Sequence, residues 1–101
     1  KIEEIAHSSL LSGSVSTIIT DPPWGSFQKI DDPAIFYETM LTEFSRVLRP
    51  DGVVVMLCAQ KDIIAQLLKE RFAQTFVLEN QYDILYAGKK TALFILQKSK
   101  T

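Results

Sequence analysis

A run of β-branched residues that stops at an acid and two prolines is the feature that most constrains this chain. Residues Val15–Thr20 (VSTIIT) have the composition of a buried strand, and Asp21-Pro22-Pro23-Trp24-Gly25 follows them directly. Each proline holds φ at about −65° and lacks an N–H group, so the chain can neither continue a strand ladder nor begin an ordinary helix there. The sequence therefore predicts a rigid loop at the carboxyl end of a strand, with Asp21 at its start.

Such a loop is well suited to hold a planar amine. The carboxyl ends of strands are where open α/β sheets bind their ligands. There the Asp21 carboxylate and the Pro22 carbonyl can both accept hydrogen bonds from one NH₂ group, and Trp24 can stack on the ring that carries it. The alternative is a purely structural turn in which Trp24 fills the core. Phe27 is either a second stacking wall or a packing residue against the next helix.

The segment after the loop predicts a helix followed by a turn. Asp32 is a suitable N-cap and Pro33 a suitable first helical residue. Apolar residues at three- and four-residue spacing then predict a helix to about Leu48 with one buried face. Pro50 ends the helix, and Gly52 is expected to supply the backbone angles of the turn.

The rest of the chain predicts an α/β sheet with a terminal hairpin. The uninterrupted apolar run Val53–Cys58 is typical of a parallel strand covered on both faces, and a helix is predicted over Lys61–Phe72. Three more strand-like segments follow at residues 76–78, 81–86 and 91–97, with a turn at 87–90. The order of strands and helices implies right-handed crossovers in a Rossmann-like, mostly parallel sheet that ends in an antiparallel hairpin.

Composition excludes several other classes of protein. The chain has 101 residues, of which 47% are hydrophobic, and this is enough for one core. Its net charge of −1 gives no global positive field for nucleic acid, so any such contact must be local. The single cysteine, Cys58, is predicted to be a small buried side chain, and His7 is the only histidine, which argues against metal sites and catalytic triads. No apolar run could span a membrane, and we expect a cytoplasmic protein.

The loop and the element order together resemble the class I S-adenosylmethionine-dependent amino-methyltransferases. Their catalytic motif is Asp or Asn, two prolines and an aromatic residue, often followed by glycine, and Asp21-Pro22-Pro23-Trp24-Gly25 matches it. The turn Leu48–Gly52 (LRPDG) is one residue from the family's Leu-Arg-Pro-Gly-Gly form. The tail Tyr82–Lys98 resembles the terminal hairpin of the RNA methylases that act on guanine N2 and often carry a THUMP domain.

The resemblance implies both a reaction and the residues that perform it. The reaction is methyl transfer from S-adenosylmethionine to an exocyclic amine of a nucleic-acid base, with guanine N2 of RNA, such as tRNA, as the first choice. Adenine N6, cytosine N4, a protein glutamine amide and a non-catalytic, methyltransferase-like interaction subunit stay open as alternatives. The implied roles are catalysis for Asp21, Pro22, Pro23 and Trp24, substrate binding for Trp24, Gly25 and Phe27, and contact with the cofactor for Asp21 and Pro22.

The chain departs from the family in one respect. These enzymes bind the cofactor through a glycine-rich turn, whereas Gly13, Gly25, Gly52 and Gly88 are each isolated in this sequence. We therefore expect residues 1–101 to be the C-terminal half of a methyltransferase domain without its cofactor-binding half, and to be inactive alone. In the family the strand that corresponds to residues 15–20 lies beside the first strand. The missing half, a second copy or a partner should therefore cover it.

Overall fold

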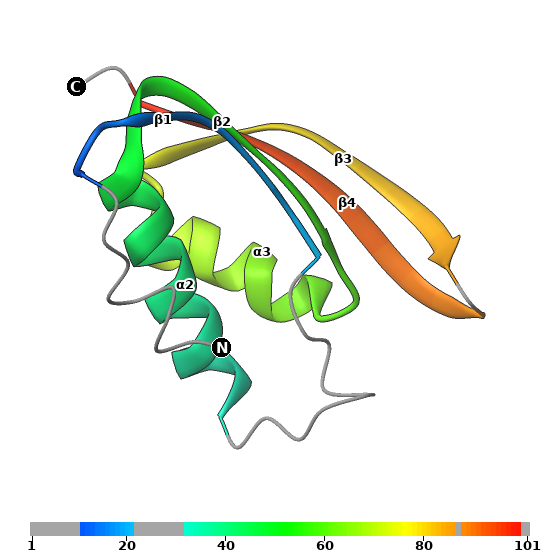
Figure 1. Ribbon diagram of the computed structural model, residues 1–101. Helices are drawn as coiled ribbons and strands as arrows, with labels where there is room; N and C mark the ends of the chain where they lie inside the picture. Colours follow the sequence, from blue (N-terminus) through cyan, green and yellow to red (C-terminus); the bar gives the residue numbers. More distant parts are fainter. Residues whose placement is uncertain (1–10, 22–31, 87, 100–101) are drawn as a thin grey trace.

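Two helices lie against one face of a four-stranded sheet (Figure 1). The computed structural model describes residues 11–21, 32–86 and 88–99. The sheet order is β1-β2-β4-β3, in which β1 and β2 are parallel and the other pairs are antiparallel. The elements in chain order are β1 (Val15–Thr20), α2 (Pro33–Val47), β2 (Leu48–Cys58), α3 (Lys61–Glu70), β3 (Phe76–Tyr86) and β4 (Lys89–Lys98). This arrangement confirms the predicted α/β sheet with a terminal antiparallel hairpin.

Helix α2 begins and ends close to the predicted positions. The Asp32 carboxylate accepts a hydrogen bond from the Ile35 N–H at 3.1 Å, and Pro33 is the first helical residue. At the other end, the Lys98 ammonium donates to the carbonyls of Ser45 at 2.6 Å and Leu48 at 2.8 Å. Lys98 therefore ties the end of β4 to helix carbonyls that have no partner within the helix. The buried apolar residues of α2 are Tyr37, Met40, Leu41, Phe44 and Val47.

The turn after α2 differs from the prediction. A residue other than Gly52 adopts the left-handed backbone conformation there. Asp51 has φ of 68°, whereas Gly52 has no positive φ. Gly52 is needed for space instead, because a Cβ atom there would lie 2.7 Å from Leu48 Cδ2 and 2.8 Å from the Arg49 carbonyl oxygen. The pairing with β1 jumps from Leu48 to Val53, so residues 49–52 bulge out of the ladder.

The predictions that strands 15–20 and 53–58 are buried were wrong for the part of the chain that the structure describes. Along β2, Val54, Met56 and Cys58 are buried under the helices, while the residues between them are half-exposed. On β1, Ile19 is 79% exposed. The composition of a strand reports its tendency to form a sheet, not how many layers cover that sheet.

The second face of the sheet is largely apolar, and no described element covers it. By register and alternation Thr17, Asn80 and Gln97 are polar residues of this face. Its apolar residues are Ile19 on β1, Val53, Val55 and Leu57 on β2, Leu93 and Ile95 on β4, and Val77, Tyr82 and Ile84 on β3. We call this set the open face. Among the described strands, β1 pairs only with β2, so it forms the edge that was expected.

The C-terminal hairpin is longer and tighter than predicted. The two strand segments expected at 76–78 and 81–86 form the single strand β3, with an irregularity between Leu78 and Asn80. Strand β4 already begins at Lys89, and Gly88 takes φ of 80° in the turn. Helix α3 ends at Glu70, and Phe72 beyond it packs against Phe76 with ring centroids 5.9 Å apart. None of the helices described is long and apolar enough to cross a membrane.

Candidate active site

Asp21 lies where the carboxyl ends of two parallel strands meet. Thr20 pairs with Met56, so Asp21 follows at the level of Leu57, and its side chain is exposed. An exposed carboxylate at this edge of an open sheet can contact a ligand bound outside the strand ends. The structure therefore places Asp21 as the sequence predicted. The other predicted site residues, Pro22, Pro23, Trp24, Gly25 and Phe27, fall outside the described residues.

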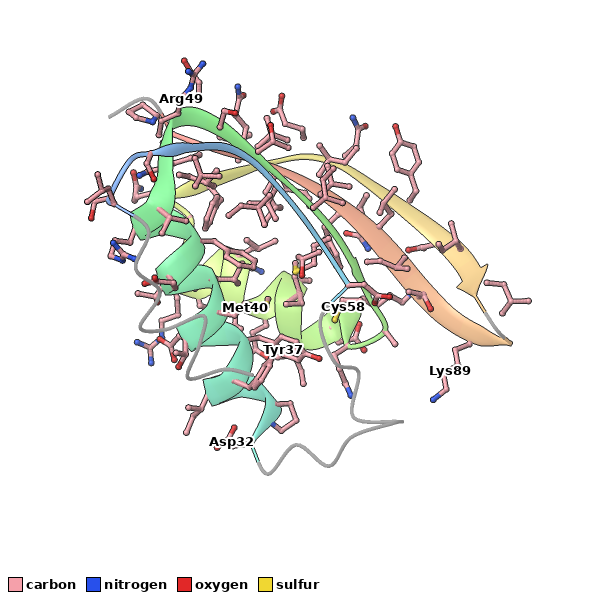
Figure 2. The ribbon with its side chains drawn as sticks, in the orientation of Figure 1. Asp32, Tyr37, Met40, Arg49, Cys58 and Lys89 are labelled. Carbon is pink, nitrogen blue, oxygen red and sulfur yellow. The ribbon has the colours of Figure 1, made fainter. Side chains whose placement is uncertain are left out.

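A buried polar pair lies at the same end of the sheet. The Tyr37 hydroxyl, from α2, lies within hydrogen-bonding reach of the thiol of Cys58, the last residue of β2. Both side chains are 0% exposed, and Figure 2 shows them between α2 and the end of β2. Burial is the main reason that the pKa of each group lies above its ordinary value, and the charge of Asp21 adds to the effect on Cys58.

This pair was only half predicted. Cys58 is buried as expected, but the sequence analysis did not single out Tyr37. The available signal was the position of Tyr37, which precedes Met40, Leu41 and Phe44 by three, four and seven residues. A tyrosine at such a position needs a polar partner for its hydroxyl when it is buried.

Arg46, which pairs with Glu43 within α2, also ties the segment before β1 to that helix. Arg46 Nε donates to Glu43 Oε1 at 2.8 Å, and Arg46 Nη1 donates to Ser12 Oγ at 3.2 Å. The Gly13 N–H also donates to the Arg46 carbonyl at 2.9 Å. Arg46 lies in the last turn of α2, where a positive charge interacts favourably with the helix dipole. In the structure it also holds the chain at the point where β1 begins.

A shallow depression on α2 is lined by Glu38, Thr39, Thr42 and Glu43. Its polar side chains already have partners, which lie within the helix except for that of Glu38, whose carboxylate lies 3.5 Å from the Arg71 guanidinium. The Thr39 hydroxyl donates to the Ile35 carbonyl at 2.9 Å, the Thr42 hydroxyl donates to the Glu38 carbonyl at 2.8 Å, and Glu43 is bound by Arg46. The depression therefore adds no group to the site at Asp21.

Residues 1–85 match the model of the UPF0020 family, described as an RMKL-like methyltransferase domain. The chain belongs to this family. A search of curated proteins found no match. The match covers the loop, both helices, and β1, β2 and β3, so membership in UPF0020 confirms the resemblance that the loop and the element order predicted.

Solved structures of methyltransferases share the fold of this UPF0020 member. TrmN from Thermus thermophilus superposes with a TM-score of 0.74 at 21% identity, over 93% of this chain and 26% of that chain. PvuII DNA methyltransferase, which is cytosine-N4-specific, gives a TM-score of 0.68 at 15% identity, over 99% of this chain and 46% of that one. SMU.1697c from Streptococcus mutans, in complex with SAH, gives a TM-score of 0.61 at 13% identity, over 86% of this chain and 52% of that one. The chain thus spans between a quarter and about half of these proteins.

The residues present fit one side of a cofactor site. A carboxylate exposed at the strand end, as Asp21 is, can lie beside a positively charged sulfonium and an amine at once. The sequence has no Gly-x-Gly turn to bind the rest of such a molecule. Among the described residues of this UPF0020 chain, Asp21 has the chemistry that suits the reactive end of the cofactor.

Proposed function

We propose that this chain is the catalytic-loop half of an S-adenosylmethionine-dependent methyltransferase that modifies an exocyclic amine of a nucleic-acid base, with guanine N2 of RNA, such as tRNA, as the first choice. The observation that carries the proposal is the position of Asp21. Its carboxylate is exposed at the carboxyl end of β1, and Pro22, Pro23 and Trp24 follow it in a chain of a methyltransferase family. Similarity in fold to the cytosine-N4-specific PvuII DNA methyltransferase supports nucleic acid as the substrate class.

In the proposed mechanism this chain orients the amine. Hydrogen bonds from the NH₂ group to the Asp21 carboxylate and the Pro22 carbonyl would direct the nitrogen lone pair and stabilise the positive charge that develops there. The cofactor would supply an electrophilic methyl group on its sulfonium. Trp24 would hold the base after rotation out of its stack, Gly25 would allow close approach, and Phe27 would form a second wall. No side chain has to act as a nucleophile.

The same proposal assigns an occupant to the open face and to the edge of β1. Ile19, Val55 and Ile95 lie in one row across three strands, and an apolar face of this size is costly to leave in water. Strand β1 also presents backbone groups that no described strand pairs. We assign both surfaces to the cofactor-binding half of the domain, which would bring the glycine-rich turn to the strand end where Asp21 lies.

Methylation of cytosine N4 is the second candidate. The similarity to the cytosine-N4-specific PvuII enzyme extends over 99% of this chain, and an Asp-Pro-Pro-aromatic loop can hold any planar NH₂ group. Adenine N6 and the glutamine amide remain chemically equivalent for the same reason. A non-catalytic interaction subunit would keep the fold but would have no need for Asp21.

Replacement of Asp21 in the complete methyltransferase domain tests the proposal. Asp21→Ala should abolish the transfer of tritium from labelled cofactor to RNA while it leaves cofactor affinity nearly intact, since the side chain contacts the amine. Asp62→Ala, which removes another exposed carboxylate from the first turn of α3, should retain activity. Mass spectrometry of digested nucleosides identifies the methylated base. Activity of Asp21→Ala within about tenfold of wild type would refute the role of Asp21.

A further inference from the structure

The β3–β4 hairpin extends past the carboxyl end of β2. Strands β3 and β4 remain paired as far as Tyr86 and Lys89, whereas β2 pairs with β4 only as far as Cys58 and Ala92. Residues 89–91 of β4 therefore project beyond the last residue of β2, by about 10 Å at 3.4 Å per residue. Figure 1 shows this projection as the far end of the yellow and orange strands.

The projection lies at the same end of the sheet as Asp21. Strands β1 and β2 are parallel and end at that edge, and Thr20, Met56 and Phe94 lie in one row across the sheet. Asp21 is therefore level with Leu93, which lies four residues along β4 from Lys89 at the hairpin tip. Because β4 is two strands away from β1, the hairpin tip lies about 10 Å to the side of Asp21 and about 14 Å beyond it. A nucleic-acid strand with one base beside Asp21 can reach the tip within a few nucleotides.

The projecting residues combine positive charge with exposed apolar surface. Lys89 and Lys90 are consecutive at the start of β4, and Leu85, which pairs with Lys90, is 73% exposed. The acid nearest to the tip, Asp83, lies 3.5 Å from the Lys61 ammonium. Lys90 is exposed, so the hairpin tip presents positive charge on a chain whose net charge is −1.

We propose that the hairpin tip binds the backbone of the nucleic-acid substrate, with Lys89 and Lys90 contacting phosphates and Leu85 packing against a sugar or base next to the modified nucleotide. This inference rests on the proposed function, because it assumes that the target base enters beside Asp21. Lysine contacts to phosphate position a strand without reading its sequence. The tip therefore acts in the same way on every sequence and sets the register of the strand relative to Asp21.

The test is direct binding of a fluorescently labelled single-stranded RNA to the complete domain, measured by anisotropy over a range of salt concentrations. Lys89→Gln with Lys90→Gln should weaken binding several-fold, equally for unrelated sequences. The slope of log affinity against log salt should become shallower by about 1.4, at about 0.7 per lost phosphate contact on a single strand. In the transfer assay the KM for RNA should rise, while kcat at saturating RNA and the affinity for the cofactor stay unchanged.

Two control variants isolate the position of the charge. Arg49→Gln with Lys69→Gln removes the same number of positive charges, and Figure 2 shows Arg49 at the opposite end of the molecule from Lys89. This control should keep the wild-type salt slope, and Lys89→Arg with Lys90→Arg should keep binding. Equal losses in the hairpin and control variants, or a hairpin variant with the wild-type slope, would overturn the proposal.

The binding measurement also separates this inference from the proposed function. RNA binding that depends on the two lysines, in a protein that transfers no methyl group to RNA or DNA, supports the hairpin surface and refutes the proposed reaction. Methyl transfer that is lost on Asp21→Ala but unaffected by the lysine changes supports the reaction and refutes the surface. A wild-type domain that binds no single-stranded RNA refutes the surface as well.

Discussion

The hydroxyl of Tyr37 and the thiol of Cys58 lie within hydrogen-bonding reach of each other, where the first turns of α2 meet the end of β2. Both groups are fully buried, and they lie at the end of the sheet that carries Asp21. Ionisation of either group would place a charge in this buried site, which is costly. This end of the fold should therefore lose stability at high pH.

Tyr37→Phe should reduce that pH dependence. Burial raises the pKa of Cys58 above 9.0 and that of Tyr37 above 10.0, their ordinary values. Between the ordinary and the folded pKa the unfolded chain binds fewer protons than the folded one, so the free energy of unfolding falls as pH rises. Each group can contribute up to about 1.4 kcal/mol per pH unit in that window. Urea unfolding from pH 7 to pH 11 should show a steep loss above pH 9 that becomes shallower in Tyr37→Phe.

Tyr82→Phe is the matched control, since Tyr82 lies on β3 and is 49% exposed. Removal of the Tyr82 hydroxyl should leave the loss of stability at alkaline pH unchanged. If Tyr37→Phe and Tyr82→Phe give the same profile as wild type, the Tyr37 hydroxyl is not coupled to folding.

Substitutions of Gly52 and Asp51, neighbours in the turn after α2, should change the free energy of unfolding in opposite directions. A Cβ atom at residue 52 would lie 2.8 Å from the Arg49 carbonyl oxygen, a backbone atom that cannot move aside easily, so Gly52→Ala should cost about 1–3 kcal/mol. Asp51→Gly relieves a φ of 68° and should be neutral or stabilising by up to about 1 kcal/mol. The midpoints of urea unfolding measure both changes. A tolerated Gly52→Ala would contradict the geometry of the turn.

Trp24 follows Pro23 in the predicted catalytic loop. Trp24→Ala should weaken binding of the target base by about 1–3 kcal/mol, the usual contribution of stacking, whereas Trp24→Phe should lose much less. Titration with substrate RNA measures the loss, and the melting temperature of each variant serves as its control. Alanine and phenylalanine variants that are equally damaging, with equal losses in melting temperature, would indicate a core residue instead.

The 101-residue chain by itself should self-associate and should bind S-adenosylmethionine weakly or not at all. The reason is that one edge of β1 is unpaired among the described strands, and that Ile19, on the open face, is 79% exposed. Sedimentation over a concentration series and calorimetric titration with the cofactor measure the two properties. Ile19→Lys should reduce the association. A folded monomer with micromolar affinity for the cofactor would refute the half-domain proposal.

The sequence by itself determined the features that depend on near neighbours along the chain. Asp32 and Pro33 define the start of α2 because an N-cap acts on the N–H of a residue three positions away. The prolines after Asp21 end β1 because they lack N–H groups wherever the chain lies. The loop and the order of the elements were also enough to identify the family, which the match over residues 1–85 confirmed.

Only the tertiary structure decided the features that depend on register and on layers. Val53–Cys58 has the same composition whether one face or two are covered, so the open face became visible only once the helices were placed. The partner of Tyr37 lies 21 residues further along the chain, and the carbonyls that Lys98 caps lie about 50 residues before it. The overhang of the hairpin past Asp21 follows from the pairing of Cys58 with Ala92, a long-range register that no local pattern specifies.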